Sequence, residues 1–91
     1  SIASFRHKGL RELFETGRTR RIAAPLHRKA TLILDLLASM ESPADCAGAW
    51  RFHALKGDRH GDYAFTVSKN WRITFSWRND MAHDVDFEDY H

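Results

Sequence analysis

The chain has 91 residues but only one cysteine, and none of its apolar runs approaches the roughly 20 residues of a membrane-spanning helix. Because Cys46 has no second cysteine to join, an internal disulfide is excluded, which fits a reducing cytoplasm. A signal-peptide pattern, internal repeats, low-complexity segments and linkers are missing too. We therefore expect one cytoplasmic domain over residues 1–91, with a single hydrophobic core.

Motifs for metal ions and nucleotides are also missing. The six histidines show no paired spacing typical of a zinc site, and a lone cysteine does not complete one. The Lys-Gly-Asp-Arg segment at residues 56–59 has one glycine and does not match a phosphate-binding loop. A Ser/His/Asp triad has no supporting motif. We therefore expect neither a bound metal nor a cofactor.

Residues 62–88 alternate between apolar and polar side chains over most of their length. The apolar members fall on odd positions: Tyr63, Phe65, Val67, Trp71, Ile73, Phe75, Trp77, Met81, Val85 and Phe87. Since successive side chains of a strand point to opposite faces, each strand has one buried face and one solvated face. The segment therefore predicts a meander of three antiparallel strands.

The same alternation limits the length of the two turns. A two-residue first loop would pair Ser68 with Trp71 and mix the faces, whereas a three-residue loop keeps the apolar residues aligned. Asn70 suits the left-handed position of such a loop. The predicted turns are residues 68–70, which pair Val67 with Trp71, and residues 78–80, which pair Trp77 with Met81.

Two helices are predicted before the meander. Apolar residues at helical spacing extend from His7 to Thr16, and Gly17 follows where a C-cap glycine belongs. A second helix is predicted from about Pro25, with Ser42-Pro43 as its end. Its apolar stripe, which we expect to pack against the sheet, consists of Leu26, Ala30, Ile33, Leu34, Leu36, Leu37 and Met40.

Together these elements predict an α+β fold. The two N-terminal helices cover the apolar odd face of a mostly antiparallel sheet of four to five strands. Residues 2–5 are a short candidate strand, and the alternation over residues 50–53 suggests a further one. The even face is left open and carries Arg72. His53 shares that face if its strand joins the same sheet.

Basic residues are concentrated toward the start of the chain. Residues 1–29 hold eight Lys/Arg against two Asp/Glu, whereas residues 30–91 hold six against ten. This asymmetry is compatible with a polyanionic partner on one side of the molecule. A solvated basic helix surface explains the charge equally well.

Titratable and basic residues gather at predicted strand ends and on the open face: His53, Lys56, Arg59, Arg72, Asp89, Tyr90 and His91. Cleavage of an RNA phosphodiester needs such a mixture. A base removes the 2′-hydroxyl proton, cations stabilise the phosphorane, and an acid protonates the leaving 5′ oxygen. Imidazole suits both proton transfers, and an aromatic ring such as Tyr90 can stack on a base. Ordinary surface residues with a frayed terminus are the competing interpretation.

Four segments resemble the signatures of HigB-type toxins of the RelE superfamily. They are Phe-Arg-His-Lys-Gly-Leu at residues 5–10, His-Ala-Leu-Lys-Gly-Asp-Arg at 53–59, Asn-Trp-Arg-Ile-Thr-Phe at 70–75 and Phe-Glu-Asp-Tyr-His at 87–91. The resemblance covers nearly the whole chain in the expected order. Over residues 18–49 only the helical pattern agrees.

This resemblance implies a compact, microbial-ribonuclease-like toxin that enters the ribosomal A site and cuts mRNA there without a metal. It implies a HigA-type helix-turn-helix antitoxin as partner, with operator DNA bound only through the complex and no membrane involved. The family's catalytic positions fall on His53, Asp89, Tyr90 and His91. Its phosphate-contacting positions fall on Lys56, Arg59 and Arg72.

We expect His53 or His91 to act as the base and the other to help as the acid. Asp89 then orients an imidazole, and Tyr90 stacks on or hydrogen-bonds the scissile nucleotide. Two other functions stay open. A ParE-type toxin shares the fold but acts on DNA gyrase without cutting RNA, and a plain RNA- or ribosome-binding module only positions phosphates.

Overall fold

The computed structural model describes residues 1–89. Over this range the helices are α1 (Lys8–Thr16) and α2 (His27–Ser39), and the strands are β1 (His53–Ala54), β2 (Asp62–Thr66), β3 (Trp71–Arg78) and β4 (Met81–Asp89). Short 3-10 turns lie at Ala24–Leu26, Pro43–Cys46 and Gly57–Arg59. The strands form one antiparallel sheet in the order β1-β2-β3-β4, which confirms the predicted α+β fold.

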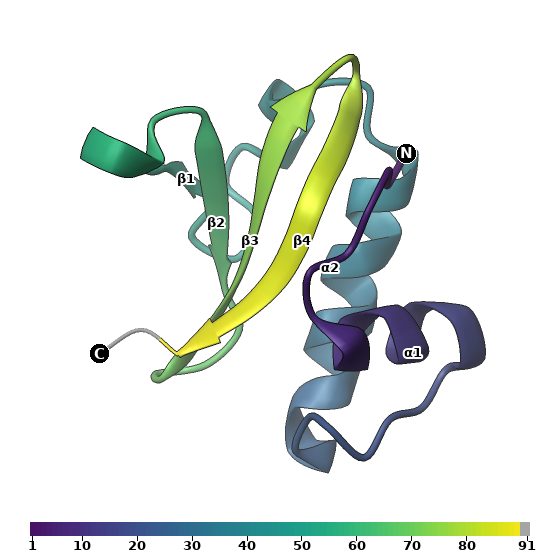
Figure 1. Ribbon diagram of the computed structural model, residues 1–91. Helices are drawn as coiled ribbons and strands as arrows, with labels where there is room; N and C mark the ends of the chain where they lie inside the picture. The colour runs from purple at the N-terminus through teal and green to yellow at the C-terminus, as the bar shows by residue number, and fades with distance from the viewer. Residues whose placement is uncertain (90–91) are drawn as a thin grey trace.

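The two helices pack on one side of the sheet, and the N-terminal segment runs beside the outer edge of β4 (Figure 1). This segment is parallel to β4 and forms two isolated bridges, Ile2 to Ala82 and Phe5 to Val85. The predicted strand at residues 2–5 is therefore present only as these bridges. None of the helices within residues 1–89 is long and apolar enough to cross a membrane.

Helix α1 begins and ends where the sequence predicts. His7 caps its first turn, because Nδ1 accepts a hydrogen bond from the Leu10 N–H at 3.2 Å. Burial lowers the pKa of His7, which favours the neutral imidazole that this cap requires. Gly17 ends the helix at φ 83°, where its N–H donates to the Leu13 carbonyl oxygen at 2.9 Å.

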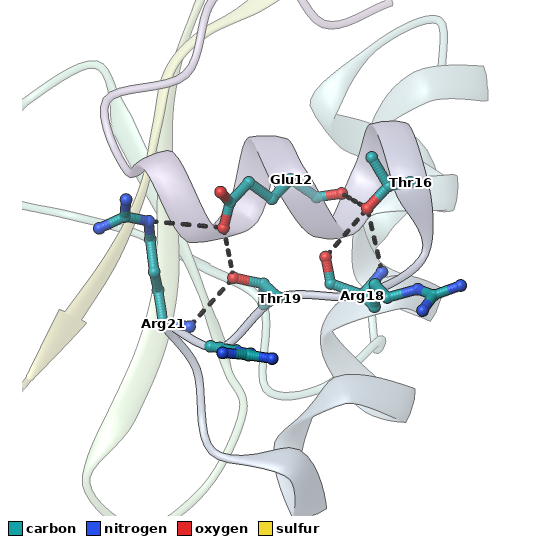
Figure 2. Close-up of a pocket in the computed structure, with 6 residues that line it drawn as sticks. Glu12, Thr16, Arg18, Thr19 and Arg21 are labelled. Carbon is teal, nitrogen blue, oxygen red and sulfur yellow. Dashed lines mark hydrogen bonds and ion pairs between the residues drawn. The ribbon is translucent and has the colours of Figure 1, made fainter.

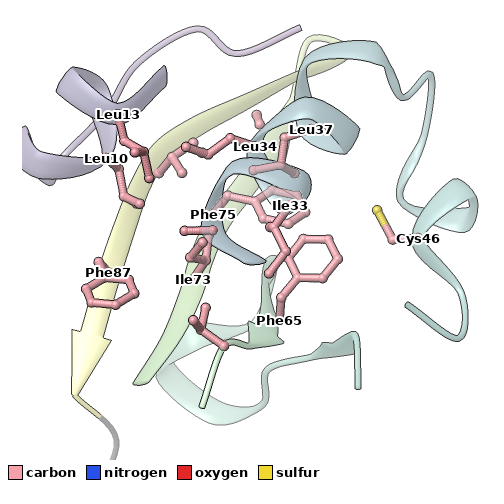
Figure 3. Close-up of a cluster of buried hydrophobic side chains, with 14 of the residues drawn as sticks. Leu10, Leu13, Ile33, Leu34, Leu37, Cys46, Phe65, Ile73, Phe75 and Phe87 are labelled. Atoms are coloured by element: carbon pink, nitrogen blue, oxygen red, sulfur yellow. The ribbon is translucent and has the colours of Figure 1, made fainter. Parts of the chain in front are cut away.

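The hydrophobic core lies between the helices and the odd face of the sheet (Figure 3). Helix α2 contributes Ala30, Ile33, Leu34 and Leu37, all fully buried, and Pro25 lies in the 3-10 turn before it. Burial of each such Leu or Ile side chain stabilises the folded state by roughly 1.5–3 kcal/mol relative to exposure to water. Cys46 is also buried, and this raises the pKa of its thiol to about 11, so the thiol stays protonated.

The β2–β3 hairpin has the predicted register. Phe65 lies opposite Ile73, and the Val67 N–H donates to the Trp71 carbonyl oxygen at 2.9 Å. Asn70 does not adopt the left-handed conformation that we expected. Instead, the Ser68 N–H also donates to the Trp71 carbonyl oxygen, at 3.1 Å, and this shared acceptor closes the loop.

The β3–β4 turn is shorter than predicted. Arg78 pairs with Met81, so the loop has two residues, Asn79 and Asp80, with φ of 53° and 60°. Two left-handed residues in succession form the type I′ turn that suits the twist of a hairpin. Ala82, not Met81, is therefore the residue buried at this position. The predicted pairing of Trp77 with Met81 was wrong. It relied on the apolar character and odd position of Met81, whereas the geometry of the two-residue turn decides the register.

A β-bulge then restores the predicted alternation. The register shifts by one residue between Thr74 and Ser76, and Asp84 in β4 adopts a left-handed φ of 53°. Val85 consequently faces the core. The shorter turn and the bulge move the register in the same direction, so Arg72 lies opposite Glu88. The predicted turn would have placed it opposite Asp86.

Strand β1 is shorter than the alternation over residues 50–53 suggests. Trp50 and Arg51 are both left-handed, with φ of 44° and 55°, so the chain turns before the strand begins. Only residues 53–54 pair with β2, and His53 lies opposite Ala64. The predicted strand therefore joins the sheet, but of residues 50–53 only His53 belongs to it.

Candidate functional site on the even face of the sheet

The face of the sheet that the helices leave uncovered carries the even-numbered residues of β2 and β3, and we call it the even face. His53 lies opposite Ala64, which in turn lies opposite Thr74, and Arg72 is two residues from Thr74 along β3. Directly opposed residues of antiparallel strands project to the same face. His53 and Arg72 therefore share the even face, separated across the sheet by two strand spacings of about 5 Å each.

Glu88, near the end of β4, is the centre of a charged network on this face. Its two carboxylate oxygens accept hydrogen bonds from Nη1 and Nη2 of Arg59 at 3.0 and 2.8 Å. Nη2 of Arg72 donates to Glu88 at 3.3 Å, and the Thr74 hydroxyl donates as well. A bidentate arginine–carboxylate pair is stronger and more directional than a single contact. Glu88 thus holds both guanidinium groups at one point of the sheet.

A second carboxylate fixes Arg59 from the other side. Nε of Arg59 donates to Asp62 at 3.0 Å, and Asp62 also accepts a hydrogen bond from the Ser76 hydroxyl. Arg59 therefore extends from the turn before β2 to the end of β4. The centre of the even face is consequently covered: Thr74 is only 2% exposed, although we expected this face to be bare.

The network shifts the ionisation of its members. Hydrogen bonds from Arg59 hold the pKa of Glu88 at about 2, below its ordinary 4.5, and outweigh the opposing effect of burial. Hydrogen bonds from Glu88 and Asp62 raise the pKa of Arg59. Glu88 is therefore a carboxylate at any physiological pH and is unsuited to proton transfer near neutrality.

His53 and Lys56 lie outside this network and are exposed. Nδ1 of His53 is 2.8 Å from the carbonyl oxygen of Arg51. A carbonyl oxygen can only accept, so Nδ1 carries a proton, and in the neutral tautomer the lone pair is on Nε2. Within residues 1–89, the Lys56 ammonium has no carboxylate partner. One basic nitrogen and one cation are thus presented to solvent.

The predicted C-terminal residues are placed only in part. Asp89 is exposed and ends β4 opposite Trp71. Because side chains alternate along a strand, Asp89 projects to the face opposite that of Glu88. The structure therefore does not bring Asp89 together with Arg72 through strand pairing. Tyr90 and His91, both predicted to be catalytic, lie outside the described residues.

The two carboxylates of the network, Glu88 and Asp62, are not among the predicted site residues. Glu88 and Asp62 occupy even positions, as Arg72 does, so the alternation already assigned them to the same face. Their contact with Arg59 required the correct register, in which Arg72 lies opposite Glu88. No sequence pattern showed that Arg59 would reach across two strands.

Two helices on one face of an antiparallel sheet, with arginines and an imidazole on the other, are features of a RelE-like toxin. The model of the family described as "RelE-like toxin of type II toxin-antitoxin system HigB" matches residues 3–91. The chain is also 39% identical, over 94 aligned residues, to Endoribonuclease HigB of Proteus vulgaris, covering 99% of each protein. The chain therefore belongs to the HigB-like toxins of type II toxin–antitoxin systems, whose partner is an antitoxin, and the predicted family is confirmed.

Proposed function

We propose that this toxin is an endoribonuclease that cuts mRNA in the ribosomal A site and so inhibits translation. The observation that carries the proposal is the exposed imidazole of His53 on the same face as Arg72. Family membership and a relative named as an endoribonuclease support it. The protein then acts in the cytoplasm, where translating ribosomes are found.

His53 is the proposed base, because the Arg51 carbonyl oxygen fixes the proton on Nδ1 and leaves Nε2 free to accept one. Nε2 takes the proton of a ribose 2′-hydroxyl, and the 2′ oxygen attacks the adjacent phosphorus. The bond from phosphorus to the 5′ oxygen breaks, which leaves a 2′,3′-cyclic phosphate. An acid protonates the departing 5′ oxygen, and each such proton transfer contributes about 10²–10⁴-fold.

The C-terminal residues complete this proposal. His91 supplies the proton to the leaving oxygen, and Asp89 orients an imidazole. Tyr90 stacks on or hydrogen-bonds the scissile nucleotide. The bidentate pair of Arg59 with Glu88 supports the role of Asp89, because it anchors β4 one residue before Asp89.

Lys56 and Arg72 are the proposed phosphate-binding cations. Lys56 is exposed, and Arg72 is directed by Glu88 at 3.3 Å. For Arg59 we propose a positioning role in place of the predicted contact with phosphate. Its Nε, Nη1 and Nη2 all donate to carboxylates, so it positions Glu88 and Arg72 rather than neutralising phosphate itself.

The partner proposed for the toxin is a HigA-type helix-turn-helix antitoxin. Operator DNA is bound only through the toxin–antitoxin complex, since the cationic residues of the even face are assigned to RNA. A small helix-turn-helix reading frame adjacent to the gene supports this assignment if it is found there.

Primer extension on a message translated in the presence of the purified protein tests the proposal. We expect cuts at a fixed position within codons, with 2′,3′-cyclic phosphate and 5′-hydroxyl ends. Equal cutting of naked RNA at positions unrelated to the reading frame would indicate a free ribonuclease. Inhibition of gyrase supercoiling with no RNA cut would overturn the proposal in favour of a ParE-like action.

A further inference from the structure

A hollow of about 580 Å³ lies away from the even face, between the end of α1 and the loop that leads to α2 (Figure 2). Its lining residues are Glu12, Thr16, Arg18, Thr19, Arg20 and Arg21. Half of them are arginines, and none of them belongs to the proposed catalytic site. We call residues 18–21 the arginine loop.

Threonine side chains fix the backbone of the arginine loop. The Thr16 hydroxyl oxygen accepts a hydrogen bond from the Arg18 N–H at 3.3 Å. The Thr19 hydroxyl donates to a Glu12 carboxylate oxygen at 2.6 Å and accepts from the Arg21 N–H at 3.1 Å. These bonds lie on both sides of the loop (Figure 2). The loop is therefore ordered before any ligand arrives, which lowers the entropy lost on binding.

Among the described residues 1–89, a carboxylate lies beside only one of the three guanidinium groups in the loop. Nε of Arg21 lies 3.4 Å from a Glu12 oxygen. Within residues 1–89, no carboxylate pairs with Arg18 or Arg20, and both side chains are exposed. The hollow therefore presents two uncompensated positive charges on a fixed backbone.

The arginine loop and the even face can be occupied at the same time. The loop joins α1 to α2, and both helices pack on the odd face of the sheet (Figure 1). A ligand held by Arg18 and Arg20 therefore does not compete with one held by His53 and Arg72.

We propose that the arginine loop binds the phosphate backbone of structured RNA. The planar fork of an arginine matches phosphate geometry, and successive arginines on one loop suit the repeated charges of a nucleic-acid strand better than a single small anion. This inference rests on the proposed function: for a toxin in the A site, the structured RNA is ribosomal RNA. The arginine loop then binds the ribosome while the even face cuts the message.

The test compares two double variants of the full chain that lose the same charge. R18Q/R20Q removes the uncompensated arginines, and R6Q/R78Q removes two exposed arginines that lie near Asp84, away from the hollow. Binding to vacant 70S ribosomes and to a blunt 20-base-pair RNA duplex is measured between 50 and 200 mM KCl. Thermal unfolding confirms that both variants are folded.

We expect R18Q/R20Q to bind ribosomes and duplex about tenfold more weakly, and its salt slope to fall by about 1.4–1.8, since each phosphate contact contributes about 0.7–0.9. R6Q/R78Q should bind within about twofold of the unsubstituted chain. Equal affinities and slopes for the two variants would overturn the inference. Weaker binding of an antitoxin with unchanged RNA binding would also overturn it, and would assign the loop to an acidic protein segment.

The two proposals fail separately. If the unsubstituted chain binds ribosomes through the arginine loop but cuts no message, the endonuclease assignment is wrong and this inference stands. If the unsubstituted chain cuts the message and R18Q/R20Q binds as tightly as the control, the endonuclease assignment stands and this inference is wrong.

Discussion

The candidate site has two parts that use their charges differently. In the paired part (Arg59, Asp62, Arg72 and Glu88), two guanidinium groups meet two carboxylates within 2.8–3.3 Å. In the open part (His53 and Lys56), both side chains are exposed. The paired part cannot move protons near neutrality, because the pKa of Glu88 is about 2. The paired part can keep the strands and side chains in position. The open part can take part in the reaction, because the fold does not depend on its side chains.

This division predicts the largest effect on activity at His53. The H53A variant should lose cleavage on programmed ribosomes by about 10²–10⁴-fold, because a general base is removed. Its free energy of unfolding should stay within about 0.5 kcal/mol of the unsubstituted chain, since the side chain is exposed. Single-turnover rates and urea unfolding measure the two quantities. H60A, which removes another exposed imidazole, is the matched control and should cut normally.

Glu88 should show the opposite pattern. E88Q keeps the side-chain shape but removes the charge that both arginines share, and we expect it to lower the free energy of unfolding by about 1–3 kcal/mol. Circular dichroism during urea unfolding measures the loss. E15Q, on the exposed surface of α1, provides the control and should leave stability unchanged. Equal stability of the two variants would contradict a stabilising role for the network around Glu88.

The same carboxylate predicts an acid dependence. The folded pKa of Glu88, about 2, lies below its ordinary 4.5, so its contribution is fully present above pH 4.5. It should be lost as the pH falls from 4.5 toward 2. The stability difference between the unsubstituted chain and E88Q should therefore shrink over this window. A difference that is constant from pH 5 to pH 2.5 would assign the effect of the substitution to packing.

A substitution of Thr74 tests the buried hydrogen bond of the Glu88 network with a smaller change. Thr74→Val preserves the shape but removes the hydroxyl that donates to Glu88, and should cost about 1 kcal/mol of stability. Thr66→Val, on the same face but outside the network, is the matched control. A loss of the same size in both variants would indicate a general effect of the strand position.

Lys56 should have the smallest effect. K56Q removes one exposed cation, so we expect about threefold to fivefold weaker binding of message at moderate salt and a salt slope lower by about 0.7. Stability should not change. K69Q, which removes another exposed lysine, controls for net charge. Unfolding at lower denaturant in K56Q would place Lys56 in the paired part instead.

The sequence predicted the layers of the fold because its periodicity is strong. Odd-numbered apolar residues such as Phe65 and Ile73 are buried where expected, and Gly17 ends α1 as a left-handed cap. The second turn was not predictable from parity alone. Two left-handed residues and a bulge at Asp84 change the register by two residues, and the alternation is the same before and after this change.

The site was predicted only in the part that depends on the face of the sheet. His53 and Arg72 share the even face because the parity of each strand decides it. The role of Arg59 was not accessible, because a long side chain from a turn can reach several strands and sequence spacing does not say which. Glu88 and Asp89 are adjacent in the sequence but project to opposite faces of the sheet. Which of the two carboxylates meets Arg72 therefore depends on the register of β4 against β3.

In the proposed mechanism a ribose 2′-hydroxyl loses its proton to His53, and the 2′ oxygen attacks the neighbouring phosphate. A message with a 2′-O-methyl group at the scissile nucleotide of the A-site codon tests this most directly in a single-turnover assay. We predict that the toxin still binds the programmed ribosome but makes no cut at the methylated position. Cutting there at the unmodified rate would contradict the mechanism.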